Sequence, residues 1–324
     1  MKRLLVYCFY DTNGIVDDFV TYFLDKMQKY CSQIIIVVNG KLEVNSKNIL
    51  QKYSNNVILR ENKGFDSGAF KDVVEKFGFE YLKEFDEVIF ANSTFYGPIF
   101  ELDTMFNKME SNQDIDFWGV TKHSDLGYQM AGKTIGAHIQ SYFLAYKKSI
   151  LNSPIFKEYW DNVKIPTNYE EAVKNYELFT TEFFESKGFK SASYIENCNI
   201  PSGEASFYNT NELVKNHNLP FIKRKIFYTE KNSIKSYIKD GAVELINFIQ
   251  NNTSYNINLI YNDIKRNYFK DVNPKNYLKN YLKLVLKQII LPWQWKHYSK
   301  KKKNLKHTME ILKKINYELL HQHS

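Results

Sequence analysis

The sequence predicts an α/β fold in which a mixed, mostly parallel sheet lies between layers of helices. Four short apolar runs, rich in Val, Ile, Leu and Phe, have the length and composition of buried strands. A segment with helical spacing of apolar residues separates the first two runs, and this alternation is typical of a parallel sheet covered on both faces. We expect a ligand to bind beyond the carboxyl ends of the strands, as in other folds of this class.

The four predicted strands follow one another within the first 92 residues. They span Lys2–Tyr10, Gln33–Asn39, Asn56–Arg60 and Asp86–Asn92. A helix is predicted between the first two, from Val16 to Tyr30, because its apolar residues recur every three or four positions. Polar residues and glycines follow every strand, at Asp11–Gly14, Asn39–Gly40, Asn62–Gly68 and Asn92–Gly97. These loops should meet at one edge of the sheet and form the candidate site.

The loop after the third strand is the most informative stretch of the chain. Gly64 and Gly68 let the backbone come close to a ligand, and Asn62 and Asp66 can hydrogen-bond hydroxyl or amide groups. The loop leads into a predicted amphipathic helix over 69–77, whose free N-terminal N–H groups favour an anion. These features fit a nucleotide or a nucleotide-sugar, although Asn, Gly and Asp also form ordinary turns and helix caps.

Composition is compatible with an enzyme that has a large core. The 324 residues are 44% hydrophobic, and 24 Phe and 24 Tyr supply rings for the core and for stacking on sugars. Cys8, Cys31 and Cys198 are far apart and lack CxxC spacing, which argues against a disulfide framework or a zinc site and indicates a reducing compartment. We expect neither a signal peptide nor a membrane-spanning helix, because no apolar stretch is long enough.

Positive charge is concentrated at the C-terminal end. Residues 275–324 hold 12 Lys and two Glu, so the net charge of +8 comes from this region and residues 1–274 carry −2. Within 275–303, a lysine stripe, an apolar helical face and two tryptophans fit a helix in an anionic membrane interface, or alternatively a helix packed on the enzyme's own core. A nucleic-acid partner is not expected, because the rest of the chain is not basic and carries no recognition motif.

Three regions are expected along the chain. Residues 1–150 form the nucleotide-sugar-binding α/β half, residues 151–230 complete that domain with helices and the acceptor side, and residues 231–324 form a helical, basic C-terminal region. Within the last region, the spacing of apolar residues predicts helices over 233–249 and 257–269.

Four segments within the first 230 residues resemble the rhamnan synthesis protein F family of glycosyltransferases. In chain order they are Glu61–Ala69, Phe90–Pro98, His138–Phe143 and Pro220–Lys225. The resemblance implies a GT-A-like fold and transfer of a sugar, typically L-rhamnose from dTDP-rhamnose, onto a cell-surface polysaccharide or a lipid-linked glycan. The alternative is a catalytically silent module of the same fold that binds saccharide or scaffolds a synthase complex.

The candidate donor-binding residues lie in the loops after the strands and in the fourth segment. They are Asp11, Asn39, Asn62, Lys63, Gly64, Asp66, Gly68, Asn92, Ser93, Lys223 and Arg224. Many GT-A enzymes hold Mg²⁺ or Mn²⁺ with an Asp-x-Asp motif after the fourth strand, where this chain has Asn92-Ser93-Thr94. Because a hard cation prefers carboxylate oxygens, no metal ligand is assigned and a divalent metal stays open. Cationic side chains such as Lys223 and Arg224 would then meet the charge of the leaving diphosphate.

A carboxylate is expected to act as the general base, because a sugar hydroxyl has a high pKa and must lose its proton as the new bond forms. Inverting GT-A enzymes often carry this base at the start of a helix, with a Gly–aromatic pair eleven residues on. The helix predicted over 176–189 has that spacing from Glu177 to Gly188. The resemblance therefore places Glu177 as the base, with Glu182 as second choice. Alternatively, Glu177 only complements the helix N-terminus.

The third segment supplies the candidate acceptor contacts, which are His138, Gln140 and Tyr142. The alternation over 141–146 predicts a strand, and residues at its start could bind an acceptor sugar, although a lone His is more often structural. Together with the basic C-terminal region, these features lead us to expect a cytoplasmic enzyme attached peripherally to the inner face of the cell membrane.

Overall fold

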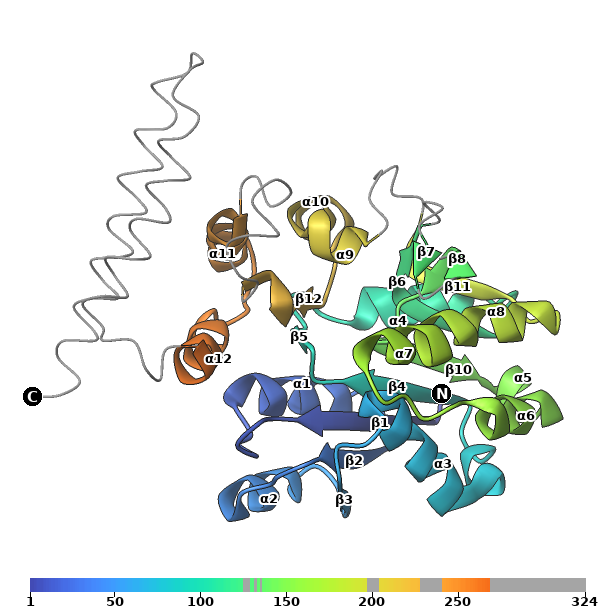
Figure 1. Cartoon of the computed structure of the whole chain (residues 1–324). Coiled ribbons are helices and arrows are strands. Elements are labelled where there is room, and N and C mark those ends of the chain that lie inside the picture. The colour runs from blue at the N-terminus through green and yellow to red at the C-terminus, as the bar shows by residue number, and fades with distance from the viewer. Residues whose placement is uncertain (125–128, 131–132, 135, 197–203, 228–240, 269–324) are drawn as a thin grey trace, which may run out of the picture. The chain divides into compact units, whose positions relative to one another are not determined.

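Figure 1 shows the computed structural model of the chain, which describes residues 1–124, 129–130, 133–134, 136–196, 204–227 and 241–268. The chain forms two compact units, Met1–Tyr268 and Phe269–Ser324, and the second lies outside the described residues. The described residues also exclude two predicted segments, which are the membrane-interface segment 275–303 and the first part of the helix 233–249.

An eight-stranded sheet forms the centre of the first unit. Its strands are ordered β11 (Ser191–Ile195), β6 (Phe117–His123), β10 (Phe143–Lys147), β4 (Glu87–Asn92), β1 (Arg3–Tyr10), β2 (Gln33–Asn39) and β3 (Asn56–Arg60), with β9 (His138–Ile139) paired to β6. Neighbouring strands are parallel except around β10, which runs antiparallel to both β4 and β6, and at β9. The predicted α/β class with a mixed, mostly parallel sheet is confirmed.

Helices cover both faces of the sheet (Figure 1), as the near-continuous apolar strands predict. One cluster of buried side chains includes α1 (Asp18–Gln28), α2 (Val44–Leu50) and α4 (Asp103–Ser111), and the other includes α3 (Phe65–Leu82), α6 (Pro154–Asn162) and α8 (Phe179–Ser186). Tyr7 of β1 belongs to the first cluster and Val6 to the second, because successive strand residues point to opposite faces. Apolar side chains are thus buried on both sides of the sheet.

The remaining described elements surround the carboxyl ends of the strands or are short. They are β5 (Phe95–Tyr96) paired with β12 (Ile222–Lys223), β7 (Gln129–Met130) paired with β8 (Lys133–Thr134), α5 (Lys148–Leu151), α7 (Tyr169–Ala172), the π-helix η1 (Val173–Leu178), α9 (Ala205–Tyr208), α10 (Thr210–His217), the 3₁₀ turn η2 (Arg224–Phe227), α11 (Gly241–Asn252) and α12 (Asn258–Tyr268). Although α11 and α12 lie in the predicted region 231–324, both are part of the first unit.

Two predicted helices begin earlier than the sequence indicates. The helix predicted over 69–77 is α3, which starts at Phe65 because Gly64 takes a left-handed conformation with φ 75° and turns the chain into the helix. The helix predicted over 176–189 already starts at Tyr169, where the side chain of Asn168 accepts a hydrogen bond from the backbone N–H of Glu171. It continues through η1 into α8, so Glu177 does not lie at a helix N-terminus.

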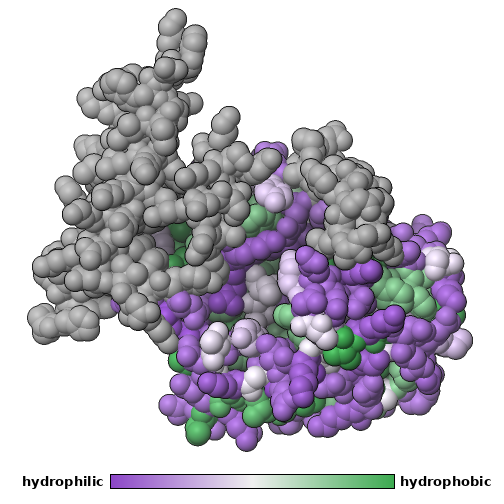
Figure 2. Space-filling model, viewed as in Figure 1, coloured by the Kyte–Doolittle hydropathy of each residue, from purple (hydrophilic) through white to green (hydrophobic). Residues whose placement is uncertain are grey.

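The surface of the described residues is mainly hydrophilic on the side seen in Figure 2, where hydrophobic residues form small separate patches. None of the helices that the structure describes is long and apolar enough to cross a membrane.

Candidate functional site

A cavity of about 780 Å³ lies beyond the carboxyl ends of β1, β2 and β4. Its volume is in the range of small-molecule sites. The side chains that line it come from the strand ends, α3, α7, η1, β12 and α12, and include Tyr10, Asp11, Asn39, Asn62, Phe65, Asp66, Asn92, Ser93, Ser141, Tyr142, Tyr169, Glu177, Lys223, Arg224 and Asn267. The cavity therefore lies at the edge of the sheet where the strand order predicts a ligand site.

The loop before α3 presents part of its polar residues to the cavity. Asn62 and Asp66 line it, whereas Lys63 is exposed and forms an ion pair with Glu61 at 2.5 Å. The two glycines shape the loop instead of contacting the cavity: Gly64 supplies the left-handed turn, and a Cβ on Gly68 would lie 2.4 Å from the carbonyl oxygen of Lys63. Phe65, which follows Gly64, also has a positive φ, of 54°.

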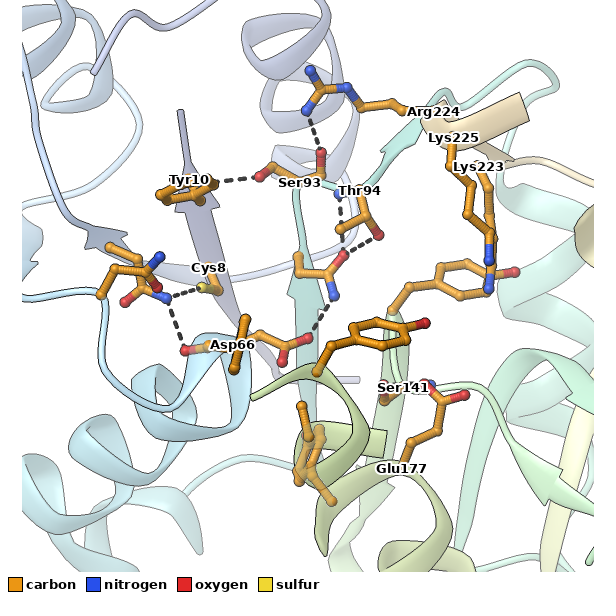
Figure 3. A pocket seen from close by; sticks show the side chains of 18 of the residues that line it. Cys8, Tyr10, Asp66, Ser93, Thr94, Ser141, Glu177, Lys223, Arg224 and Lys225 are labelled. Carbon is orange, nitrogen blue, oxygen red and sulfur yellow. Dashed lines mark hydrogen bonds between the residues drawn. The ribbon is translucent and has the colours of Figure 1, made fainter. Parts of the chain in front are cut away.

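Asp66 and Asn92 join α3 to the end of β4. Asn92 Nδ2 donates to Asp66 Oδ2 at 2.7 Å, and Asn92 Oδ1 accepts from the backbone N–H and the hydroxyl of Thr94 at 3.1 and 2.6 Å (Figure 3). Burial raises the pKa of Asp66, and the hydrogen bonds from Asn92 and the Ser67 N–H only partly offset this effect. Asn92 therefore both stabilises a turn and faces the cavity.

Neighbouring strand ends carry two further predicted donor residues. Asn39 Nδ2 donates to the Phe65 carbonyl at 2.8 Å, and Asn39 Oδ1 accepts from Arg60 Nη1 at 2.7 Å. Ser93 Oγ accepts from the backbone N–H of Tyr10 at 3.1 Å. These bonds tie the ends of β1, β2, β3 and β4 to the loop of α3, so the polar rim of the cavity is held in one arrangement.

Asp11 lies in the cavity wall, but both of its oxygens already have partners. Oδ1 accepts from the backbone N–H groups of Asn13 and Ile15 at 2.9 and 3.0 Å, and Oδ2 accepts from Arg266 of α12 at 2.5 Å. Burial raises the pKa of Asp11, but the hydrogen bonds from Arg266 and from the two N–H groups outweigh this and leave the pKa below its usual value. Asp11 thus stabilises its own loop through the two backbone N–H groups and links this loop to α12 through Arg266.

Glu177 faces the cavity from the π-helix η1, a rare element that occurs frequently at functional sites. Its Oε2 accepts from Ser141 Oγ at 2.6 Å, and its Oε1 lies 3.3 Å from His138 Nε2. Burial by itself raises the pKa of Glu177. Hydrogen bonds from His138 and Ser141 and the positive charge of Lys223 outweigh this effect, and they lower the pKa to about 2. The carboxyl group is therefore an anion at any physiological pH. Glu182, the second candidate base, is exposed on α8 and is not part of the cavity wall.

The three predicted acceptor residues have different surroundings. Tyr142 lines the cavity, and its hydroxyl lies 2.9 Å from Thr121 Oγ1. Gln140 is buried in the interior, where its Oε1 accepts from the hydroxyls of Thr121 and Ser206 at 2.7 and 2.6 Å. His138 is also buried and contacts Glu177 rather than solvent. Only Tyr142 among the three could touch an acceptor directly, because the other two are enclosed by protein.

The basic triplet that begins at the end of β12 divides between two walls of the cavity (Figure 3). Arg224 donates to the Ser93 carbonyl at 3.0 Å and to Asp263 of α12. Lys223 and Lys225 instead both donate to Glu204, at 2.6 and 2.9 Å, and Lys223 Nζ lies 5.2 Å from the centre of the Tyr142 ring. The arginine thus lies with the strand ends and the lysines lie with Tyr142 on the side of Glu177.

The part of the chain that the structure describes contains no cluster of three or more His, Cys, Asp or Glu side chains able to hold a metal. At the position where GT-A enzymes place carboxylates, Asn92 is engaged with Asp66 and Thr94. An amide and two hydroxyls fit a hard divalent cation poorly, so we assign no step to a metal.

Several cavity residues were not anticipated from the sequence. Ser141 belongs to the third resembling segment, so its motif could have pointed to it. Tyr169 lies outside the four resembling segments, and Asn267 lies in a helix whose apolar spacing predicts only packing. Among the described residues, three of the four exposed Phe or Tyr side chains line the cavity: Tyr10, Phe65 and Tyr169, with 45%, 37% and 67% exposure.

The proteins that resemble this chain share little sequence identity with it. An uncharacterised protein of Sinorhizobium fredii, y4gN, is 23% identical over 160 residues, which are 49% of this chain and 40% of that protein. A cytidylyltransferase from Leptospira borgpetersenii has a TM-score of 0.38 at 13% identity, covering 79% of this chain and 99% of the other. A putative nucleotide-diphospho-sugar transferase from Desulfovibrio desulfuricans has a TM-score of 0.37 at 11% identity, covering 81% and 98%.

The family comparison is more extensive. The model of the family "Rhamnan synthesis protein F" matches residues 34–309. This span contains all four resembling segments and the cavity walls from β2 to α12. Because this match covers well over half of the sequence, the chain belongs to the rhamnan synthesis protein F family.

Proposed function

We propose that the protein is an inverting glycosyltransferase, which moves L-rhamnose from dTDP-rhamnose onto a cell-surface polysaccharide or a lipid-linked glycan. The observation that carries the proposal is the placement of a carboxylate that is ionised at neutral pH, Glu177, in a cavity whose other walls hold the Asp66–Asn92 pair and Arg224. Membership of a family named for rhamnan synthesis supports both the transferase activity and the sugar.

The donor would lie against the strand ends, with its sugar near Asp66 and Asn92 and its diphosphate near Arg224. As the bond between the anomeric carbon and the diphosphate breaks, negative charge develops on the leaving oxygen. A cation held in a fixed position stabilises that charge without reorganising during the reaction. Arg224 meets this condition, because Ser93 and Asp263 hold its guanidinium.

The acceptor would approach from the side of Glu177 and Tyr142. Its hydroxyl oxygen attacks the anomeric carbon while the hydroxyl proton passes to Glu177, and the nucleoside diphosphate departs from the opposite face. A carboxylate with a pKa of about 2 is a weak base, so it accepts the proton late, after the new C–O bond has begun to form. Displacement at dTDP-β-L-rhamnose in this way would give an α-linkage.

Aromatic rings at the cavity supply surfaces for flat ligand groups. The side chains of Tyr10, Phe65 and Tyr169 are exposed, although most large aromatic residues of the fold are buried. An exposed ring has one face available for a nucleobase or for the C–H face of a pyranose. Such surfaces fit a site that binds both a nucleotide and sugars.

Titration with nucleoside diphosphates, followed by a donor hydrolysis assay, tests this function. We expect dTDP to bind more tightly than UDP, GDP or CDP, and we expect dTDP-β-L-rhamnose to be hydrolysed slowly in the absence of an acceptor. Asp66→Ala should abolish hydrolysis, and Glu182→Gln, a change on the exposed face of α8, should leave it intact. Binding of none of the four nucleotides would contradict the proposal.

A catalytically silent saccharide-binding or scaffold module is the second candidate. Asn92-Ser93-Thr94 replaces the Asp-x-Asp motif, and the Asn92 amide is already engaged with Asp66 and Thr94. A silent module would bind saccharide or nucleotide without releasing sugar to water, so the hydrolysis assay distinguishes the two functions.

We further propose that residues 275–303 attach the enzyme to the anionic inner face of the cytoplasmic membrane, where a lipid-linked acceptor is presented. The charge of this segment supports the proposal, because nine Lys and no Asp or Glu lie within 275–303. Lysines near an anionic surface contribute about 1 kcal/mol each, so a helix of this kind can bind reversibly without spanning the bilayer.

A further inference from the structure

Helix α12 carries a fully buried carboxylate that is bonded to the cavity arginine. Asp263 has no exposed surface. Its Oδ1 accepts from Arg224 Nη2 at 2.9 Å, and its Oδ2 accepts from Arg224 Nε at 3.2 Å and from the Tyr96 hydroxyl. Asn267 adds a donor to Oδ1 at 2.7 Å. A buried carboxylate with this set of donors is well compensated, and its pairing with the guanidinium is bidentate.

The position of Arg224 is determined by these contacts together with two others. Nη1 donates to the Ser93 carbonyl at the end of β4, at 3.0 Å. The guanidinium also lies over the Phe19 ring, 4.6 Å from its centre. Asp263, Ser93 and Phe19 therefore hold the group from three directions in a residue that lines the cavity.

The same helix also stabilises the loop after β1. Arg266, one turn beyond Asp263, donates to Asp11 at 2.5 Å and to Asp17, which precedes α1. Burial raises the pKa of Asp17, and the nearby Asp263 raises it further, against the effect of Arg266. Asn267 itself lines the cavity. A helix from the C-terminal part of the chain thus contacts two walls of the site, at Arg224 and at Asp11.

We propose that Asp263 is a positioning residue, which holds Arg224 in the orientation that binds the diphosphate of the donor. The assignment rests on the proposed function of the cavity. Asparagine at position 263 would keep the size of the side chain but would turn an N–H group toward the N–H groups of Arg224. The guanidinium would then lose its bidentate partner and its fixed orientation, although its charge would remain.

A double-mutant cycle on nucleotide binding tests the assignment. The variants are Asp263→Asn, Arg224→Ala and the double variant, and the measurement is the dissociation constant of dTDP and of UDP by isothermal titration. We expect Arg224→Ala to weaken binding about tenfold or more, as for the loss of hydrogen bonds to a charged group. Asp263→Asn should weaken it nearly as much, and the double variant should be no weaker than Arg224→Ala, because Asp263 acts only through Arg224.

Glu87 provides the matched control. It is also a buried carboxylate paired with an arginine, Arg3, at 2.8 Å, but it lies at the start of β4, at the opposite edge of the sheet. Glu87→Gln should lower the melting temperature without changing the dissociation constant. Losses that add in the double variant, or normal binding by Asp263→Asn, would overturn the assignment.

A second variant covers the case in which Asp263→Asn does not fold. Arg224→Lys keeps the positive charge but cannot bridge Asp263 and the Ser93 carbonyl with a planar fork. We expect it to bind dTDP nearly as weakly as Arg224→Ala, whereas wild-type affinity would show that orientation by Asp263 is not required. If the wild-type protein binds neither nucleotide, the proposed function fails together with this assignment.

Discussion

Replacing Glu177 with glutamine separates the proposed base from residues that only shape the cavity. The amide has the size of the carboxylate and can still accept the hydrogen bond from Ser141 Oγ, which lies 2.6 Å from Oε2. It cannot take the proton of an acceptor hydroxyl. Because a general base typically contributes about 10²–10⁴-fold, we expect transfer to fall by roughly a hundredfold or more while dTDP binding is retained.

The same substitution should lower stability in a pH-dependent way. The pKa of Glu177 is about 2 in the folded protein, against an ordinary value of 4.5. A lowered carboxyl pKa stabilises the folded state above the unfolded value, and the stabilisation is lost as the pH falls from 4.5 toward 2. At about 1.4 kcal/mol per pH unit the difference is roughly 3 kcal/mol, and the 22% exposure of the side chain makes this an upper value. The free energies of unfolding of Glu177→Gln and wild type should therefore converge on acidification.

Glu182→Gln is the control for both measurements. Glu182 is exposed on α8, outside the cavity wall, so its substitution should leave transfer and stability close to wild type. Transfer is measured with the donor at saturation, and stability by urea unfolding between pH 3 and 7. Near-normal transfer by Glu177→Gln would refute the assignment, and a loss confined to Glu182→Gln would move the base to that residue.

The remaining predictions concern the donor loop, the metal and the C-terminal region. Asp66→Ala should abolish turnover with little change in melting temperature, because burial raises the pKa of Asp66 and its charge adds no stability; lower stability with normal turnover would indicate a purely structural cap. Activity should persist in EDTA, since Asn92 and Thr94 offer no carboxylate; loss in EDTA with recovery in Mn²⁺ would contradict this. Binding to liposomes should rise with anionic lipid and fall with salt. Truncation after Asn273 should remove this binding but spare donor hydrolysis, because α12 ends at Tyr268; equal binding to neutral liposomes, or unfolding of the truncated protein, would favour packing on the enzyme core.

Elements that depend on local apolar periodicity could be predicted closely from the sequence. β2 and β3 have the predicted bounds, and α1 lies within the predicted helix. The predicted start of α3 is wrong, because the apolar pattern begins at Ala69 whereas the helix begins at Phe65, directly after the left-handed Gly64. Backbone conformation at a single glycine determines that boundary, and periodicity does not report it.

The contacts that assemble the site depend on residues far apart in the chain. Asp263 reaches Arg224 across 39 positions, and Arg266 reaches Asp11 across 255. Gln140 lies in a resembling segment and looked like an acceptor contact, yet the hydroxyls of Thr121 and Ser206 enclose it. A polar residue in a motif can serve either the ligand or the fold, and only the tertiary structure shows which hydrogen bonds it makes.

The basic triplet at the end of the last resembling segment illustrates the same limit in the site itself. As a sequence pattern, Lys223, Arg224 and Lys225 form one positively charged patch, and we predicted that the first two meet the donor diphosphate. Lys223 ends β12 and Arg224 begins the turn η2, and in the folded chain Arg224 contacts the strand ends while Lys223 lies over the Tyr142 ring. The charge of Lys223 lowers the pKa of Glu177 from that side. Neutralising Arg224 should therefore weaken nucleotide binding, whereas neutralising Lys223 should raise the pKa of the proposed base, and a single motif would yield two separable kinetic effects.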